Sequence, residues 1–199
     1  EIVTPGAGPF LVTNLGVSTS QDALYWSDMG SIPGRPGTRF EPPAAIKQPA
    51  LNRSTADGSG GQEVQQLPLP GDILFDIASS HVYWVMGDTI YRSDVNGSVI
   101  TTVVATTGRP RHLALDATNG RIYWTQADPD GVRSGLRGVY RANTNGTGVE
   151  RVVEVFDGGD PRGLAIDVAA DRLYWLEVSD EPSLTIGGFD QFNAQVSSA

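Results

Sequence analysis

The side chains that could carry out catalysis in this chain are few and scattered. The two histidines, His81 and His112, stand at positions that do not correspond to each other, and no HExxH or other metal-ligand spacing is present. The sequence also lacks a Gly-x-Ser-x-Gly segment, which holds the nucleophile of many hydrolases. We therefore expect both histidines to be structural, and we expect no enzymatic activity.

An acidic loop is the next candidate for chemistry. Asp128-Pro129-Asp130-Gly131 offers carboxylates, and calcium takes oxygen ligands. The segment lacks the spacing of a known calcium loop, so we expect an ordinary turn here. No cofactor is expected, and calcium is kept as the alternative.

Other charged residues recur at fixed intervals. The recurrent acids are Asp76, Asp116 and Asp167, and the recurrent bases are Arg53, Arg92 and Arg141. Each acid is expected beside a tight turn, where a carboxylate can accept backbone hydrogen bonds. An arginine can bind a carboxylate through two parallel hydrogen bonds, so we expect these arginines to form structural ion pairs with the repeated acids.

These charges are positioned by an internal repeat that is marked by tryptophan. All four tryptophans follow a tyrosine, in the pairs Tyr25-Trp26, Tyr83-Trp84, Tyr123-Trp124 and Tyr174-Trp175. The pairs are 58, 40 and 51 residues apart. Repeats of about 40–50 residues with strand-like content are typical of propellers and solenoids.

Each repeat has the pattern of four short strands. Runs rich in Val, Ile, Thr, Tyr and Trp alternate with Gly, Asn, Asp and Pro. Asn-Gly occurs at 96–97, 119–120 and 145–146, and such dipeptides favour tight hairpin turns. Four-stranded units repeated around an axis are the blades of a β-propeller.

The repeat resembles the class B repeat of the low-density-lipoprotein receptor, the YWTD β-propeller family. Tyr25-Trp26-Ser27-Asp28 fits the family motif, whereas Tyr123-Trp124-Thr125-Gln126 lacks its final Asp and the other two pairs depart further. The resemblance implies an extracellular protein-interaction scaffold. The family's usual ring has six blades, but this chain contains four units.

We therefore predict an all-β fold, a β-propeller of four four-stranded blades in a single domain. The blades are expected at about residues 6–67, 68–106, 107–156 and 157–199, and the last is completed by residues 1–5 as an N-terminal closing strand. The alternative is that two chains of four blades pair, for example as a homodimer.

Composition narrows the partners. The net charge is −9, from 14 Lys and Arg against 23 Asp and Glu, whereas nucleic acids and anionic membranes attract basic surfaces. No apolar run is long enough for a membrane span. The chain has no cysteine and contains three sequons, at Asn52, Asn96 and Asn145. We expect a secreted protein in which these asparagines are candidates for glycosylation, although the last two sequons also read as simple hairpin turns.

The strand order predicts where a ligand binds. Loops between the second and third strands lie on the same edge as the links between blades, and loops on a rigid scaffold usually carry binding. The Pro-rich loop at 29–50 belongs to this edge. The candidate ligand-binding residues are Asp28, Arg109, Gln126, Asp128, Asp130, Asp160 and Glu177.

Lectin-like carbohydrate binding is the leading hypothesis, because a small propeller could present several aromatic and polar sugar sites. A protein–protein interaction propeller of the receptor type is the first alternative. A metal-dependent propeller hydrolase is the second.

Overall fold

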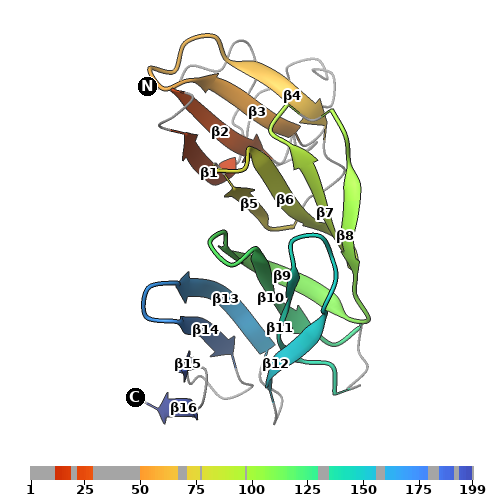
Figure 1. Cartoon of the computed structure of the whole chain (residues 1–199), viewed down its shortest axis with the longest axis vertical. Coiled ribbons are helices and arrows are strands. Elements are labelled where there is room, and N and C mark those ends of the chain that lie inside the picture. Colours follow the sequence, from red (N-terminus) through yellow and green to blue (C-terminus); the bar gives the residue numbers. More distant parts are fainter. Residues whose placement is uncertain are drawn as a thin grey trace, which may run out of the picture.

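The computed structural model describes residues 12–18, 22–28, 50–66, 71–76, 78–96, 98–129, 135–155, 160–178, 184–190 and 193–198. Every regular element in these ranges is a β-strand. The sixteen strands form four antiparallel sheets of four strands each, here called sheets A to D (Figure 1). The expected all-β class and the four four-stranded units are confirmed.

The strands of each sheet follow chain order. Sheet A contains β1 (Val12–Ser18), β2 (Ala23–Asp28), β3 (Ala50–Thr55) and β4 (Gln62–Gln66). Sheet B contains β5 (Ile73–Asp76), β6 (His81–Met86), β7 (Thr89–Asp94) and β8 (Thr101–Ala105). Sheet C contains β9 (Arg109–Asp116), β10 (Arg121–Ala127), β11 (Gly138–Asn143) and β12 (Glu150–Glu154). Sheet D contains β13 (Asp160–Asp167), β14 (Arg172–Val178), β15 (Leu184–Asp190) and β16 (Asn193–Ser198).

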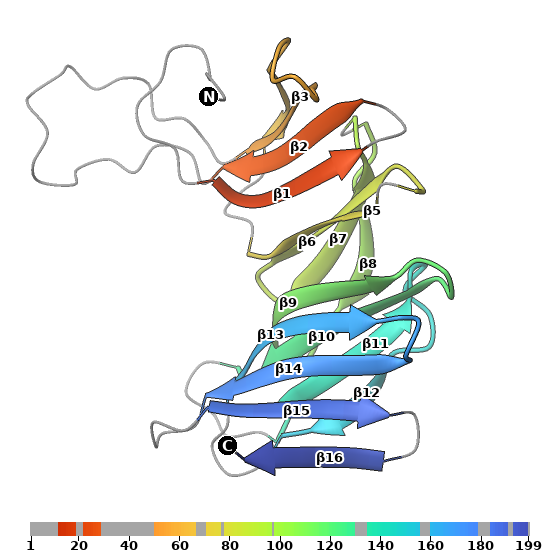
Figure 2. The same cartoon turned by 90° about the vertical axis from the view of Figure 1, so that its left-hand side faces the viewer.

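Successive sheets meet through their first strands. β1 contacts β5, β5 contacts β9, and β9 contacts β13, so these four inner strands lie side by side in chain order (Figure 2). Sheets A and D lie at opposite ends of the molecule, and the described strands form an open arc (Figure 1).

The repeated aspartates close the turn between the first and second strands of a sheet. Asp116 accepts hydrogen bonds from the backbone nitrogen of Asn119 at 3.0 Å and from its side-chain nitrogen at 2.6 Å. Asp76 accepts from the backbone nitrogen of Ser79, and Asp167 from that of Ala170. The structural role expected for these acids is confirmed.

The repeated tyrosines and tryptophans build the core between sheets. Trp84 stacks on Tyr91, and Trp124 stacks on Tyr140, with ring centroids 5.8 and 5.7 Å apart. Each stacked pair sits directly opposite on neighbouring strands of one sheet. None of the four tryptophans exposes more than 6% of its surface, so they bury large apolar areas, and Trp84, Trp124 and Trp175 lie in the clusters where adjacent sheets pack together.

The outer strand of the last sheet differs from the expectation. We predicted that residues 1–5 would supply it, but β16 pairs with β15 in that place. The third strand, β15, ends at Asp190, so enough chain is left for a fourth strand of six residues. Residues 1–5 themselves lie outside the described residues.

None of the described residues belongs to a helix that is long and apolar enough to cross a membrane.

Candidate functional site

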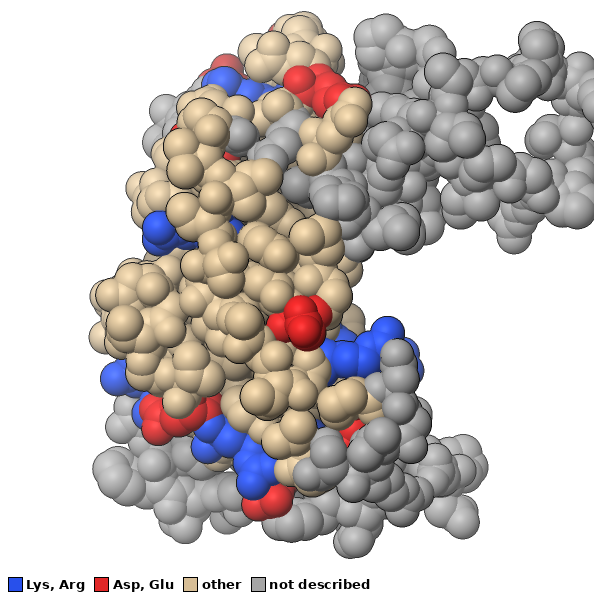
Figure 3. All heavy atoms as spheres, turned by 90° about the vertical axis from the view of Figure 1, so that its right-hand side faces the viewer, with Lys and Arg blue, Asp and Glu red and all other residues tan. Residues whose placement is uncertain are grey.

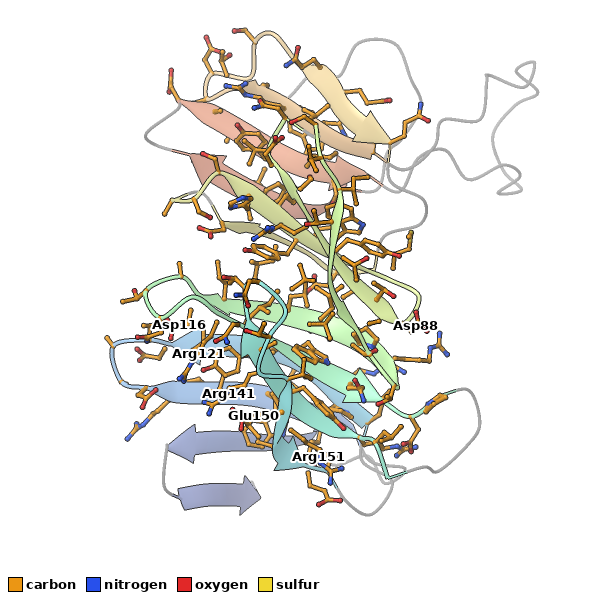
Figure 4. The ribbon with its side chains drawn as sticks, turned by 45° about the vertical axis from the view of Figure 1, so that its right-hand side comes forward. Asp88, Asp116, Arg121, Arg141, Glu150 and Arg151 are labelled. Atoms are coloured by element: carbon orange, nitrogen blue, oxygen red, sulfur yellow. The ribbon has the colours of Figure 1, made fainter. Side chains whose placement is uncertain are left out.

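The strand register brings most of the candidate binding residues to one edge of the arc. Asp28, Gln126 and Glu177 lie at or near the ends of β2, β10 and β14. Arg109 and Asp160 begin β9 and β13, which run in the opposite direction to their partners. We call this edge the loop edge and the opposite one the turn edge. Figure 4 shows the separation: Asp88 lies at the loop edge, whereas Asp116 and Arg121 lie at the turn edge.

Two of these candidates hold tryptophan side chains in place. Trp124 Nε1 donates to Gln126 Oε1 at 3.3 Å, and Trp175 Nε1 donates to Glu177 Oε1 at 2.8 Å. Residues two apart on a strand point to the same face, so this acceptor position is fixed by the repeat. Asp28 stands at the same repeat position, but its side chain lies outside the described part of the structure.

Sheet B lacks this acceptor. Its corresponding residue is Met86, and Trp84 Nε1 is buried without a hydrogen-bond partner in the described part of the chain. A thioether is a weak acceptor, so the methionine leaves the indole N–H unsatisfied. An acceptor at the second position after the tyrosine–tryptophan pair therefore stabilises the blade. The four repeats carry Asp, Met, Gln and Glu there, so only sheet B has a residue without a strong acceptor.

Asp128 holds the two residues that precede β11. Its carboxylate accepts from the backbone nitrogen of Leu136 at 3.0 Å and from Nε of Arg137 at 2.9 Å. Gln126 Nε2 adds a hydrogen bond to the carbonyl oxygen of Leu136 at 3.1 Å. Leu136 and Arg137, which precede β11, are thus held in place at the loop edge. Asp130 lies outside the described residues.

Asp160 links sheets C and D. It forms ion pairs with Arg111 of β9 at 3.3 Å and with Arg162 of its own strand at 3.0 Å. Arg109 is exposed two residues before Arg111. The loop edge of these two sheets therefore presents both signs of charge, and acidic and basic groups are also interspersed on the face in Figure 3.

A groove of about 540 Å³ runs along the inner strands. It is lined by residues of β1, β9 and β13 and of the segment 72–75, among them Phe75, Leu113 and Leu164. Asp72 Oδ2 accepts from the backbone nitrogen of Leu113 at 2.7 Å and so joins sheets B and C. Asp72 and His112 share a repeat position but differ in residue type, so the repeat pattern alone does not mark this position as functional.

The repeated arginines do not pair with the repeated aspartates. Arg141 Nε binds Glu150 Oε1 at 2.5 Å, and the two side chains lie close together in Figure 4. Arg92 Nη1 donates to the carbonyl oxygen of Thr144 at 3.4 Å, in the next sheet. The register explains the difference, because each arginine lies opposite the tyrosine of its own sheet rather than beside the turn.

Tyr83, which lies opposite Arg92, has a hydroxyl that is harder to ionise than that of a free tyrosine. Burial raises the pKa of Tyr83 above its ordinary value, and the neighbouring Arg92 guanidinium offsets part of the effect. Burial also raises the pKa of Tyr140. Both hydroxyls therefore stay protonated at neutral pH.

The sequons differ in accessibility. Asn52 is 5% exposed, and its Nδ2 donates to the carbonyl oxygen of Ala50, so we no longer expect a glycan there. Asn96 and Asn145 are exposed at the turn edge, where their glycosylation stays a prediction. In the second of these turns, Thr147 Oγ1 donates to Asn145 Oδ1 at 2.7 Å.

Metal ligands do not gather in the described residues. No group of three His, Cys, Asp or Glu side chains within them could hold a metal ion.

No family model matches the chain. Among characterised proteins, it is 29% identical over 133 residues to protein cueball of Drosophila virilis, which covers 66% of this chain and 19% of that protein. It is 26% identical over 179 residues to the proto-oncogene tyrosine-protein kinase ROS of Gallus gallus, which covers 86% of this chain and 7% of that protein. The chain thus spans a fifth or less of the length of these relatives.

Solved structures share the fold. The nidogen/laminin complex contains a chain that superimposes with a TM-score of 0.70 at 16% identity, covering 96% of this chain and 65% of that one. A gluconolactonase from Xanthomonas campestris gives a TM-score of 0.66 at 18% identity, covering 95% and 62%. A manganese-bound oligogalacturonate lyase gives 0.64 at 14% identity, covering 97% and 54%. These likenesses support a propeller-type arrangement of the four sheets.

Proposed function

We propose that this chain is a non-enzymatic protein-interaction module that acts outside the cell and binds its partner through the loop edge. The observation that carries the proposal is the use of the repeat aromatics. All four tryptophans are buried between or within sheets. Their rings therefore contribute to packing and expose no face on which a sugar could stack. We therefore prefer a protein partner to the carbohydrate expected from the sequence.

The loop edge suits recognition by a protein. Asp128 and Gln126 hold Leu136 and Arg137 in place, so little conformational freedom is lost at these two residues on binding. The half-exposed charges of Arg111, Asp160 and Arg162 lie on the same edge and give it both signs of charge. Such interspersed charges favour selectivity among protein partners over tight non-specific attraction.

The structural neighbours are compatible with this proposal and with others. The nidogen structure is a complex with laminin, so a fold of this type can carry a protein partner. The lactonase and the lyase have the same type of fold, which is why the proposal rests on the residues of this chain rather than on fold.

The test is to probe an array of extracellular proteins and a glycan array with the same folded chain. We expect saturable binding to one or a few proteins. Arg162→Glu, on the loop edge, should weaken that binding at least tenfold by reversing an exposed charge. Thr118→Glu, which adds a charge at the turn edge, is the matched control and should leave it unchanged.

Two results would contradict the proposal. Binding to glycans without binding to proteins would support the lectin hypothesis instead. Equal loss of binding in Arg162→Glu and Thr118→Glu would show that the loop edge is not the binding surface. Hydrolysis of a lactone by the purified chain would contradict the non-enzymatic assignment.

Secretion can be tested separately on the sequons. Expressed through a eukaryotic secretory pathway, the chain should gain mass that a peptide N-glycosidase removes, and Asn96→Gln with Asn145→Gln should abolish the gain. Asn52 provides the internal control, because its buried amide should remain unmodified. If Asn96 and Asn145 stayed unmodified in a secreted, folded product, the predicted glycosylation would be wrong.

A further inference from the structure

The indole N–H of Trp84 is a buried donor that sheet B leaves unsatisfied. Trp84 exposes 2% of its surface, and among the described residues its Nε1 is the one buried side-chain nitrogen or oxygen without a hydrogen-bond partner. In sheets C and D the equivalent nitrogens donate to Gln126 and Glu177. Because a buried donor without an acceptor destabilises the fold, a group that placed an oxygen beside Trp84 would stabilise sheet B.

Met86 occupies the position that carries the acceptor in sheets C and D. It lies two residues after Trp84 on β6, on the same face of the strand, and it packs on the buried cluster that contains Trp84. Its Sδ is the third atom of the side chain, as is the Cδ that carries Oε1 in Gln126 and Glu177. An oxygen bonded to Sδ would therefore lie as many bonds from the backbone as the accepting oxygen in sheets C and D.

We propose that Met86 is a site of reversible oxidation and that its sulfoxide supplies the missing acceptor to Trp84. The reaction needs a two-electron oxidant, of which hydrogen peroxide is the simplest. A sulfur lone pair attacks one peroxide oxygen, and an S–O bond forms as the O–O bond breaks. The displaced hydroxide takes the proton left on the transferred oxygen and leaves as water, so the sulfur is oxidised by two electrons and the peroxide is reduced. The inference does not depend on which partner the loop edge binds.

A small oxidant can reach Met86. Its side chain is only partly buried, and it ends β6 directly before the exposed residues Gly87 and Asp88. Asp88 lies at the loop edge in Figure 4. The chain has two methionines and no cysteine, so no thiol competes for the oxidant. The thioether is thus accessible from the loop edge, whereas the indole that it packs on is not.

The surroundings of Met86 reverse the usual effect of methionine oxidation. A sulfoxide in a protein core normally disrupts packing, because it makes an apolar side chain polar. Here the new oxygen meets a donor that is otherwise unsatisfied, so it adds a hydrogen bond and also removes the cost of the buried N–H. We expect oxidation of Met86 to raise the melting temperature by about 2–4 °C, the shift that one ordinary hydrogen bond gives in a chain of this length.

The test uses the full chain with Met29→Leu, which leaves Met86 as its only methionine. Treatment with hydrogen peroxide should add the mass of one oxygen atom and raise the melting temperature. The indole N–H signal of Trp84 in NMR spectra, assigned by its loss in Trp84→Phe, should move downfield and exchange with solvent at least tenfold more slowly. The two methionine sulfoxide reductases, one for each sulfoxide epimer, should together reverse these changes.

Three variants in the Met29→Leu background serve as controls. Met86→Leu has no thioether, so peroxide should change neither its mass nor its melting temperature. Gln126→Met, added to Met86→Leu, moves the thioether to the acceptor position of Trp124, and peroxide should then recover part of the stability that this substitution costs. Val149→Met, at an exposed residue of the turn edge and also combined with Met86→Leu, should be oxidised without a change in melting temperature.

Three results would overturn the proposal. A fall in melting temperature on oxidation of Met86 would show that lost packing outweighs the new hydrogen bond. A Trp84 indole signal that neither shifts nor gains protection would show that the sulfoxide oxygen does not bind it. Resistance of Met86 to peroxide in the folded chain, while Val149→Met is oxidised, would show that Met86 is not a modification site. If Met29→Leu is unstable, the native chain gives the same comparison, because the masses of its peptides locate each added oxygen.

Discussion

Replacing Met86 with glutamine should stabilise the protein, although it puts a polar side chain into a partly apolar site. Trp84 Nε1 is buried without a partner in the described structure, while the equivalent Trp124 donates to Gln126. A buried donor without an acceptor costs about 1–3 kcal/mol. The glutamine oxygen would lie two residues along the same strand face, where sheet C already has this geometry.

The magnitude is reduced by lost packing. Met86 is half-buried against a cluster that includes Leu51 and Trp84, and exchanging its thioether for an amide gives up part of that contact. We expect a net gain of about 1 kcal/mol in the free energy of unfolding. For a chain of this size, 1 kcal/mol corresponds to a rise of about 2–4 °C in melting temperature.

The assay is chemical denaturation followed by tryptophan fluorescence, with calorimetry for the melting temperature. Met86→Leu is the matched control, because it keeps the apolar volume and supplies no acceptor. Gln126→Met is the mirror experiment and should cost about 1–3 kcal/mol, since it removes the acceptor from Trp124 and the hydrogen bond to Leu136. The reasoning fails if Met86→Gln is no more stable than Met86→Leu.

Three further predictions concern turns and pH. Gly146→Ala should cost about 2 kcal/mol or more by urea denaturation, because a β-carbon would lie 2.0 Å from the carbonyl oxygen of Val103 at a φ of +88°. Gly58→Ala is its control, because Gly58 has a similar φ of +83° but open space around it. Its loss in the free energy of unfolding should be limited to about 1 kcal/mol, and equal losses in the two variants would contradict the steric argument. Asp116→Ala should cost about 1–2 kcal/mol by removing two hydrogen bonds from its turn, Asp116→Asn should recover part of that, and no difference between the two would argue against the turn contact. Burial raises the pKa of Tyr83, so its contribution to stability is complete below pH 10 and is lost as the pH rises above that value; a flat stability profile from pH 9 to 12 in comparison with Tyr83→Phe would contradict this.

The regular parts of the fold follow from local signals. Asp116 and its counterparts mark a turn because a carboxylate two or three residues before backbone N–H groups can accept from them, and this needs no distant partner. The tyrosine–tryptophan pairs mark the second strand of each sheet for a similar reason, since alternation places one ring on each face. These features were predictable from one chain.

Other features depend on contacts far apart in sequence. Asn52 looks like an ordinary sequon, yet its side chain is only 5% exposed in the folded chain. Asp72 looks like a loop residue, yet its carboxylate accepts from the backbone nitrogen of Leu113, 41 residues along the chain. Tyr174 is 38% exposed whereas the other three repeat tyrosines expose 5% or less, although all four have the same sequence context.

The β11–β12 turn has a consequence for how the molecule loses its structure. Gly146 lies against the backbone of Val103, and the carbonyl oxygen of Thr144 accepts from Arg92. The β11–β12 turn of sheet C therefore packs against the outer strands of sheet B. When each unit is completed by the next, unfolding propagates as in a one-dimensional chain of nearest neighbours, from the ends inward. Thermal fraying should therefore begin at the outermost units, and sheets B and C should form the last surviving nucleus.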